Sequence, residues 1–287
     1  MHIHVPVYGF VSTSPILSSS NSIDGNYLEN HGLNRTDTLL KADNYTWAPL
    51  PASVIAPPQW LREMNRGNDM HWAEDINSIA LLLKDGFDKK DCVGVERVIK
   101  QYFDVDQLVD YIAINTILLE GDQTYHNYLL HRRQGEVKWR HFFWDKDGAL
   151  DLFRSPQKIK NYNTFKFGVS YKNGVMVHLR YQPNYLLQNF LNAKGMYEKV
   201  HKKVLEFTDK KTGLLNGKRF TTTISNFSKR VRPFVEKGKA DKITHKVFDA
   251  EIKRLKKVYA HPEKLWEEFE VKWWGKNGTA PTCGEWS

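Results

Sequence analysis

The amino-acid sequence predicts an α+β domain that is mostly helical and contains one β-hairpin. Apolar residues recur every three or four positions in several segments, which is typical of amphipathic helices. Two short runs of aliphatic and aromatic residues, 128–132 and 137–144, flank a turn sequence around Gly135 and read as paired strands. Hydrophobic residues at 41% and aromatic residues at 13% indicate a folded chain rather than a disordered one.

The first part of the chain ends in a proline-rich stretch. Four prolines between positions 49 and 58 indicate a turn-rich linker after residue 50. Beyond it the spacing of apolar residues predicts a helix over 60–85, with glycines at 67 and 86 as its breaks. A short helix is predicted over 96–102.

The best-defined helix is predicted over 104–120. Its apolar residues keep a regular helical spacing, and Asp104 or Asp106 is expected to cap its N-terminus. Gly121 can adopt the left-handed backbone conformation in which helices often end. Asp122 is therefore expected on the loop that directly follows a buried helix.

The C-terminal half is predicted to be helical after an irregular segment. Residues 151–178 lack a clear period, and an Asn-Gly pair at 173–174 favours a tight turn there. Helices are predicted over 181–207 and 221–235, and over 246–258 continuing towards 270.

Three polar residues have a spacing that is typical of phosphoryl transfer. Asn127 follows Asp122 by five residues, and Asp145 follows Asp122 by 23. In protein kinases one Asp orients the substrate hydroxyl, an Asn five residues later binds metal, and an Asp on a later strand binds the metal that bridges the ATP phosphates. The predicted hairpin would bring Asn127 and Asp145 to the same end of the sheet. Oxygen ligands of this kind suit Mg²⁺ or Mn²⁺ rather than zinc.

A calcium-binding loop is a second interpretation of the acidic residues 145–151. An EF-hand requires Gly at loop position 6 and Glu at position 12. With Asp145 at position 1, Gly148 falls at position 4, and the region of position 12 is rich in Lys and Gln. The EF-hand interpretation therefore fails.

The chain resembles the spore coat protein H (CotH) kinases, a family of atypical secreted protein kinases. The resemblance lies in Phe-Asp-Val-Asp-Gln-Leu-Val-Asp-Tyr at 103–111, Gly-Asp-x-x-x-His-Asn at 121–127 and Trp-Asp-x-Asp at 144–147. It extends more loosely to Ile-Asp-x-x-Tyr-Leu at 23–28, to Leu-Lys-Ala-Asp at 40–43 and to the segment 184–190.

The resemblance implies an atypical protein-kinase-like fold and ATP-dependent phosphorylation of Ser or Thr in a secreted or surface protein. It implies that Asp122 is catalytic and that Asn127 and Asp145 bind Mg²⁺ or Mn²⁺, with Asp147 as a further metal ligand. His126, beside Asn127, is a candidate contact to phosphate. The alternative is a binding protein of the same fold, either a pseudokinase or a surface adhesin.

One departure from the family concerns the N-terminal lobe, which supplies a cationic residue for the nucleotide phosphates. Few residues precede the 23–28 motif, and the chain has neither a glycine-rich kinase loop nor a Val-Ala-Ile-Lys motif. We therefore expect an incomplete N-lobe, with residues 1–50 as a remnant of the N-lobe or hinge and 51–287 as a kinase-like C-terminal lobe. Lys41 is the candidate phosphate contact, and Arg132 or Arg140 could replace the missing cation.

The net charge of +9 is concentrated in the C-terminal part, where Lys and Arg pairs recur from 202 to 257. They are interpreted either as solvated helix faces or as a surface for an acidic partner or ATP phosphates. No nucleic-acid partner is predicted, because zinc-finger, RNA-binding and homeodomain patterns are absent from the sequence. The oligomeric state stays open.

Targeting and redox signals are weak in this chain. The first ten residues lack the basic start and apolar core of a signal peptide, and no apolar run of membrane-spanning length occurs. A secreted or surface location is implied by the resemblance, and four Asn-x-Ser/Thr glycosylation sequons, at 34, 44, 226 and 277, lean slightly in the same direction. The two cysteines, Cys92 and Cys283, form no metal motif and leave one disulfide as an option.

Overall fold

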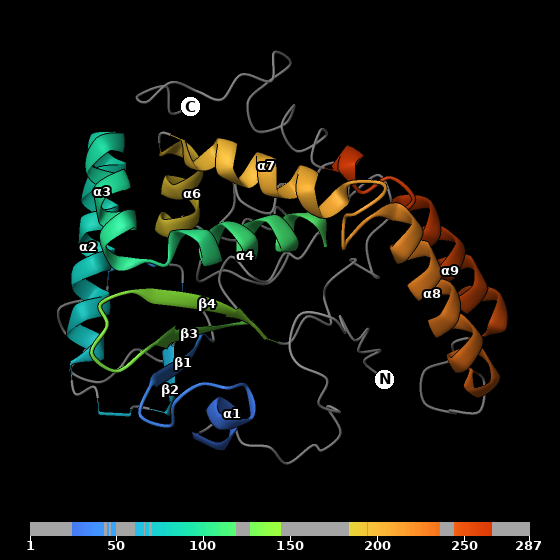
Figure 1. Ribbon diagram of the computed structural model, residues 1–287, viewed down its shortest axis with the longest axis horizontal. Helices are drawn as coiled ribbons and strands as arrows, with labels where there is room; N and C mark the ends of the chain where they lie inside the picture. Colours follow the sequence, from blue (N-terminus) through green and yellow to red (C-terminus); the bar gives the residue numbers. More distant parts are fainter. Residues whose placement is uncertain are drawn as a thin grey trace.

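The computed structural model of this 287-residue chain describes residues 25–42, 45, 47–49, 61–65, 67–68, 71–118, 127–144, 184–193, 195–235 and 244–265. Within these residues the fold has one antiparallel sheet and helices on both of its faces (Figure 1). The fold is mixed α/β, mostly helical with a small sheet, and this confirms the predicted α+β class.

The sheet has four strands in the order β2-β1-β3-β4. The strands are β1 (Thr38–Ala42), β2 (Leu61–Asn65), β3 (Tyr128–Arg132) and β4 (Trp139–Phe143). Strands β3 and β4 form the predicted hairpin, and β1 pairs with β3 from a distant part of the sequence. Strand β1 lies before residue 50 and β3 after it, so one sheet spans the predicted boundary.

A short helix covers one face of the sheet, and longer helices cover the other (Figure 1). Leu28 of α1 packs with Leu39 and Leu129 on the first face. On the second face α4 crosses the sheet, with α7 packed on α4 and α6 linking α7 to the α2–α3 pair. The helices are α1 (Gly25–Asn30), α2 (Trp72–Lys89), α3 (Cys92–Tyr102), α4 (Val105–Ile117), α6 (Tyr185–Asn192) and α7 (Met196–Thr208).

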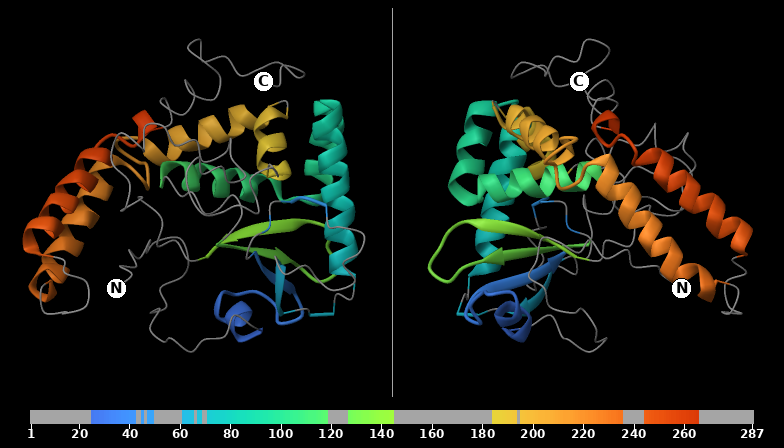
Figure 2. Two further views of the ribbon diagram at one scale, coloured as in Figure 1. Left: turned by 180° about the vertical axis from the view of Figure 1, so that it is seen from behind. Right: turned by 45° about the vertical axis from the view of Figure 1, so that its right-hand side comes forward.

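The last two helices project from the rest of the described structure, which contains the sheet and helices α1 to α7 and is called the body below (Figure 2). Helix α8 (Gly217–Val231), the 3₁₀ turn η3 (Arg232–Phe234) and α9 (His245–Val258) form an antiparallel arm, which projects beside the sheet-bearing body in Figure 2. At its base, Tyr259 donates a hydrogen bond from its hydroxyl to the Leu118 carbonyl at 3.2 Å. The arm is thereby tied to the C-terminal end of α4.

The helix predicted over 60–85 differs from the structure at both of its ends, because contacts with distant segments outweigh the local pattern. Residues 61–65 form β2 rather than helix, since Leu61 pairs with Ala42 across the sheet edge. Helix α2 runs through Gly86 instead of breaking there. A Cβ at Gly86 would lie 2.4 Å from Val95 Cγ2, so glycine allows α3 to pack closely on α2.

The helix predicted over 181–207 is two helices, α6 and α7. Asn184 begins α6 by accepting a hydrogen bond from the Leu187 backbone amide at 2.9 Å. Gly195, at φ 76°, adopts the left-handed conformation between the two helices. In the part of the chain that the structure describes, no helix is long and apolar enough to cross a membrane.

Candidate active site

The hairpin positions Asn127 at one end of the sheet. Tyr128 pairs with Phe143 at this end, and Arg132 pairs with Trp139 at the other. Asn127 directly precedes β3, and Trp144 directly follows β4, so the two lie at the same end. Asp145 is the next residue after Trp144 in the chain. The predicted placement is confirmed for Asn127, whereas Asp145 lies outside the described residues.

Asn127 has an unusual backbone for a residue with a side chain. Its φ is 57°, in the left-handed region, and its exposed fraction is only 4%. Asn enters this region more easily than other residues because its short amide can bond to the nearby backbone. The strand therefore begins with a sharp change in chain direction that holds the Asn127 amide at a buried position.

The chain between α4 and β3 contains the predicted catalytic residue. Helix α4 ends at Ile117, slightly earlier than predicted, and Leu118 caps it. Eight residues, 119–126, then lead to Asn127. Asp122 and His126 belong to this segment, and they lie outside the described residues, as do Asp145 and Asp147.

Helix α4 is clamped to β4 at its N-terminal end. The Asp104 side chain caps the helix by accepting from the Gln107 backbone amide at 3.3 Å, which confirms one of the two predicted caps. The side-chain oxygen of Gln107 accepts from the His141 backbone amide at 2.9 Å, and its amide nitrogen donates to the His141 carbonyl. The helix before segment 119–126 and the hairpin after it are therefore held together.

Lys41 lies close to the same end of the sheet. Ala42 pairs with Tyr128 and Lys41 with Leu129, so β1 places Lys41 two residue pairs from Asn127. Strand alternation puts Lys41 on the face that α1 covers, where its side chain is half-buried. Its predicted role as a phosphate contact stays a prediction.

Sequence reasoning missed a second cation beside Lys41. Arg62 of β2 pairs directly with Lys41 across the sheet and is exposed. The two side chains lie on the same face of the sheet, because residues directly opposite each other on paired strands share a face. The signal that could have revealed Arg62 is the short segment 61–65 between prolines and Gly67, bounds that are typical of a strand.

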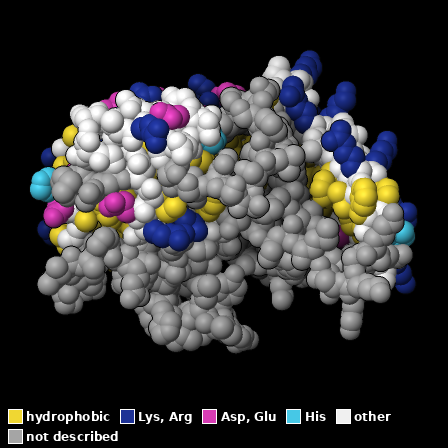
Figure 3. Space-filling view, turned by 90° about the horizontal axis from the view of Figure 1, so that it is seen from below, with side chains coloured by type: hydrophobic (Ala, Val, Ile, Leu, Met, Phe, Trp, Pro, Cys, Tyr) yellow, Lys and Arg dark blue, Asp and Glu magenta, His cyan; other side chains and the backbone are white. Residues whose placement is uncertain are grey.

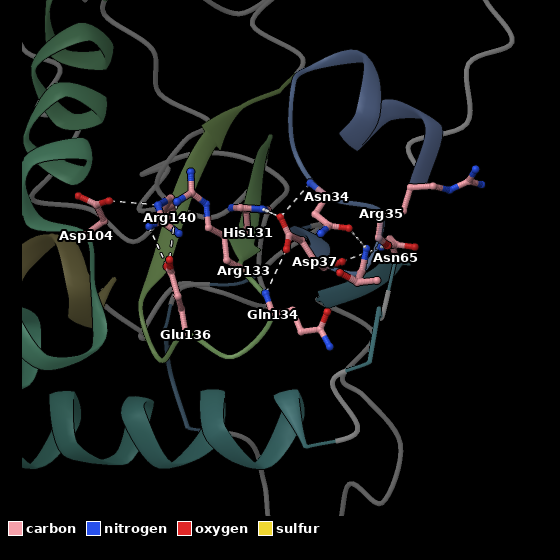
Figure 4. A network of polar contacts seen from close by, with 11 residues as sticks. Asn34, Arg35, Asp37, Asn65, Asp104, His131, Arg133, Gln134, Glu136 and Arg140 are labelled. Atoms are coloured by element: carbon pink, nitrogen blue, oxygen red, sulfur yellow. Dashed lines mark hydrogen bonds and ion pairs between the residues drawn. The ribbon is translucent and has the colours of Figure 1, made fainter.

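Arg132 and Arg140, the predicted replacements for the missing cation, are not brought towards Asn127 by the hairpin. Arg132 Nη1 lies 2.7 Å from Asp75 Oδ2, and its guanidinium stacks over Trp139. Arg140 bonds to Asp104 at 3.1 Å and Glu136 at 2.9 Å (Figure 4). Both arginines occupy the end of the hairpin opposite Asn127.

The His141 side chain on β4 is buried among aromatic rings. Its Nε2 accepts a hydrogen bond from Trp47 Nε1 at 3.2 Å, so the proton of the neutral ring resides on Nδ1. The rings of Tyr111 and Tyr128 each lie 5.4 Å from it. Burial lowers the pKa of His141 from 6.5 to about 3, because the charged ring would lose its hydration.

The low pKa of His141 predicts a loss of stability in acid. An unfolded chain protonates this histidine below pH 6.5, whereas the folded protein keeps it neutral down to about pH 3. The unfolded state therefore binds more protons in this window, and at pH 5 the cost is roughly 2 kcal/mol. Urea unfolding at pH 7.5 and pH 5 should show this loss in the wild type. His141→Gln, which keeps an acceptor but does not titrate, should lose less, and an equal loss in both proteins would contradict the prediction.

The described residues bring Asn127 and Lys41 towards one end of the sheet but show no complete metal site. Among them, no three His, Cys, Asp or Glu side chains are grouped closely enough to hold a metal ion. The predicted carboxylate ligands are not part of this set. The oxygen donors expected here, one amide and two carboxylates, have the chemistry that Mg²⁺ and Mn²⁺ prefer.

A helix clamped to a hairpin, with a buried Asn at the hairpin's start, defines an α+β protein with its candidate site at one end of a small sheet. The model of the CotH kinase protein family matches residues 18–265. The chain therefore belongs to the CotH kinase family, as the resemblance in sequence indicated, and this membership points to a kinase-like function. No curated protein matches the chain.

Proposed function

We propose that this chain is an ATP-dependent protein kinase that phosphorylates Ser or Thr residues of a secreted or surface protein. One observation carries the proposal. The register of β3 and β4 puts Asn127 at the end of the sheet where the chain continues to Asp145. Asn127 also directly follows segment 119–126, which contains Asp122. Family membership supports the same chemistry.

The roles of the residues follow from their chemistry. Asp122 would accept a hydrogen bond from the substrate hydroxyl and orient it towards the γ-phosphate. Asn127 and Asp145 would hold Mg²⁺ or Mn²⁺, with Asp147 as a further ligand and His126 at the phosphates. The bound metal would neutralise charge on the ATP phosphates. The buried, left-handed Asn127 supports its part, because a fixed amide oxygen costs little to organise.

Lys41 and Arg62 would supply positive charge near the nucleotide. Their direct pairing across β1 and β2 concentrates two cations on one row of the sheet. We therefore assign the phosphate contact to this pair rather than to Lys41 alone.

A location outside the cytosol is part of the proposal. Cys92, the first residue of α3, is buried and disulfide-bonded. Cys283, the only other cysteine of the chain, lies outside the described residues. Disulfides persist in oxidising compartments and are rare in the cytosol, which supports a secreted or surface protein.

Intact-mass measurement after incubation with ATP and Mn²⁺ tests the proposed function. Self-phosphorylation should add mass in ~80 Da steps, one for each phosphoryl group. Samples with EDTA, or with ATP replaced by its non-hydrolysable β,γ-methylene analogue, should gain none. A protein that is stabilised by ATP in thermal unfolding but gains no mass, alone or on added casein, would point to the non-catalytic binding protein instead.

Removing the two cations should weaken nucleotide binding. We expect Lys41→Met and Arg62→Met each to raise the KM for ATP about tenfold, since each deletes a charge near the phosphates. The ATP-induced rise in Tm should shrink in parallel, which gives a readout independent of turnover. Lys138→Met, an exposed cation near the hairpin turn, is the matched control. Unchanged KM and Tm shifts in both variants would show that Lys41 and Arg62 do not contact the nucleotide.

A further inference from the structure

The arm formed by α8, η3 and α9 has an unusual charge. These three elements contain ten Lys and Arg residues against two carboxylates, a net charge of +8 out of the chain's +9. The carboxylates are already used: Asp249 pairs with Arg232 at 2.9 Å, and Glu251 pairs with Arg254. Eight cations of the arm are left without a carboxylate partner among the described residues.

The helices of the body have a more balanced charge, since α2 has two lysines against four carboxylates and α7 has three lysines against two. On α2 both lysines pair with carboxylates one turn away, Lys89 with Asp85 at 2.8 Å and Lys84 with Asp88. Lys203 of α7 likewise pairs with Glu206 at 3.1 Å. Ordinary solubility is therefore achieved in this chain by mixed charge. The unbalanced charge of the arm is a local feature rather than a general property of its surface.

The unpaired cations form stripes on the outward faces of the arm. On α9, Lys246, Lys253 and Lys257 are exposed, and their spacing of seven and four residues puts them on one side of the helix. The exposed cations of α8 lie at its two ends: Lys218, Arg219, Lys229 and Arg230. Eleven residues of helix span about 16 Å, the length of about five residues of extended peptide.

Exposed apolar side chains accompany the cations at the tip of the arm. Phe234 is 63% exposed and Val247 is 57% exposed. Both lie at the same end, because Arg232 contacts Asp249 through its guanidinium and His245 through its carbonyl. Figure 3 shows hydrophobic side chains gathered on the arm with Lys and Arg around them.

We propose that the arm is a docking surface for an acidic polypeptide segment that also carries apolar side chains. This proposal does not rest on phosphoryl transfer by the chain. Carboxylates of the partner would meet the stripes of Lys and Arg, and its apolar side chains would cover Phe234 and Val247.

The composition of the arm favours a polypeptide over the other polyanions. A helix that binds a membrane surface buries a broad apolar face in the lipid. The apolar stripes of α8 and α9, with Ile224, Ile252 and Leu255, instead belong to the core of the protein. Sequence-independent nucleic-acid binding stacks successive bases on several aromatic rings, whereas Phe234 is the one aromatic among the exposed large apolar side chains of the described residues.

Fluorescence anisotropy can test the docking surface directly. The probe is a labelled peptide of three Glu-Glu-Leu-Ser repeats, and the control probe replaces each Glu by Gln. Wild type should bind only the acidic probe, with an affinity that falls as salt rises. The variant Lys229→Glu, Arg230→Glu, Lys253→Glu, Lys257→Glu should bind about tenfold more weakly or worse.

Matched variants distinguish an effect of the arm's own cations from an effect of the net charge of the whole chain. Reversal of four exposed cations elsewhere, Lys90→Glu, Lys138→Glu, Lys199→Glu and Lys202→Glu, makes the same change in net charge and should shift the Kd by less than about twofold. Phe234→Ser with Val247→Ser should weaken binding several-fold without changing its salt dependence. Glutamine in place of glutamate at the four arm positions provides a second test if the reversed arm unfolds.

Specific outcomes would overturn the proposal. Equal loss of binding in the two four-site variants would show that only net charge matters. Binding of phosphatidylserine vesicles or duplex DNA in preference to the acidic peptide would assign the arm to a membrane or a nucleic acid. An unchanged Kd in the Phe234 and Val247 double variant would show that these two apolar side chains do not contact the peptide.

Discussion

Alanine at Asp122, Asn127 or Asp145 is expected to lower the rate of phosphoryl transfer by about 10²–10³-fold or more in each case. Each change removes a group proposed to orient the hydroxyl or to hold the metal at the ATP phosphates. Because these groups act as a unit, the triple variant should be little slower than the slowest single variant. Phosphate incorporation followed by intact mass over time provides the rates.

Asn127 allows a sharper version of this experiment. Its left-handed backbone, at φ 57°, costs most side chains roughly 1 kcal/mol, so Asn127→Ala changes both the backbone and the amide. Glycine adopts this conformation freely, so Asn127→Gly removes only the amide. Both variants should be equally slow if the amide is the ligand. Asp88→Ala, an exposed carboxylate on α2, is the matched control, and activity retained in Asn127→Gly would exclude Asn127 as a ligand.

The parts of the site that could be predicted from sequence are those built by local interactions. The hairpin register follows from two short runs around one turn, and it placed Asn127 correctly. The Asp104 cap is likewise a contact between neighbours in sequence. Local geometry determines these features, so a single sequence reveals them.

The remaining parts depend on contacts between distant segments, which no local pattern reveals. The sequence predicts helix over 61–65, but pairing with β1 outweighs the modest helical preference of these residues and makes them strand β2. The Lys41–Arg62 pair depends on that pairing. The contact of Gln107 could not be predicted for the same reason. Its side-chain oxygen accepts a hydrogen bond from the backbone amide of His141 on β4, which lies 34 residues later in the sequence.

The Asp37–His131 contact is a further example, and it explains how β1 is held to the hairpin. Asp37 directly precedes β1, and its Oδ2 lies 3.0 Å from His131 Nε2 on β3 (Figure 4). Its carboxylate also accepts from the backbone amides of Asn34 at 3.2 Å and Gln134 at 3.0 Å. Burial lowers the pKa of His131 more than Asp37 raises it, so a neutral ring donates its Nε2 proton to the carboxylate near pH 7.

Asp37→Ala should therefore lower the free energy of unfolding by roughly 3–5 kcal/mol, because the carboxylate accepts three hydrogen bonds and a hydrogen bond to a charged group contributes about 1.5–3 kcal/mol. The change leaves two backbone amides and a buried imidazole without their acceptor. Asp37→Asn keeps an oxygen that can accept one of these bonds, and it should cost about half as much. Urea unfolding at pH 7.5 measures the difference.

The size of the Asp37 effect depends on burial, and an exposed ion pair provides the control. Asp249 and Arg232 form a two-bonded pair on the arm, with each side chain about half exposed. Asp249→Ala should cost about 1 kcal/mol or less, because water and salt screen an exposed pair. Equal losses in Asp37→Ala and Asp249→Ala would show that the Asp37 network contributes little, and that β1 is held to β3 chiefly by its backbone ladder and by Leu39 and Leu129.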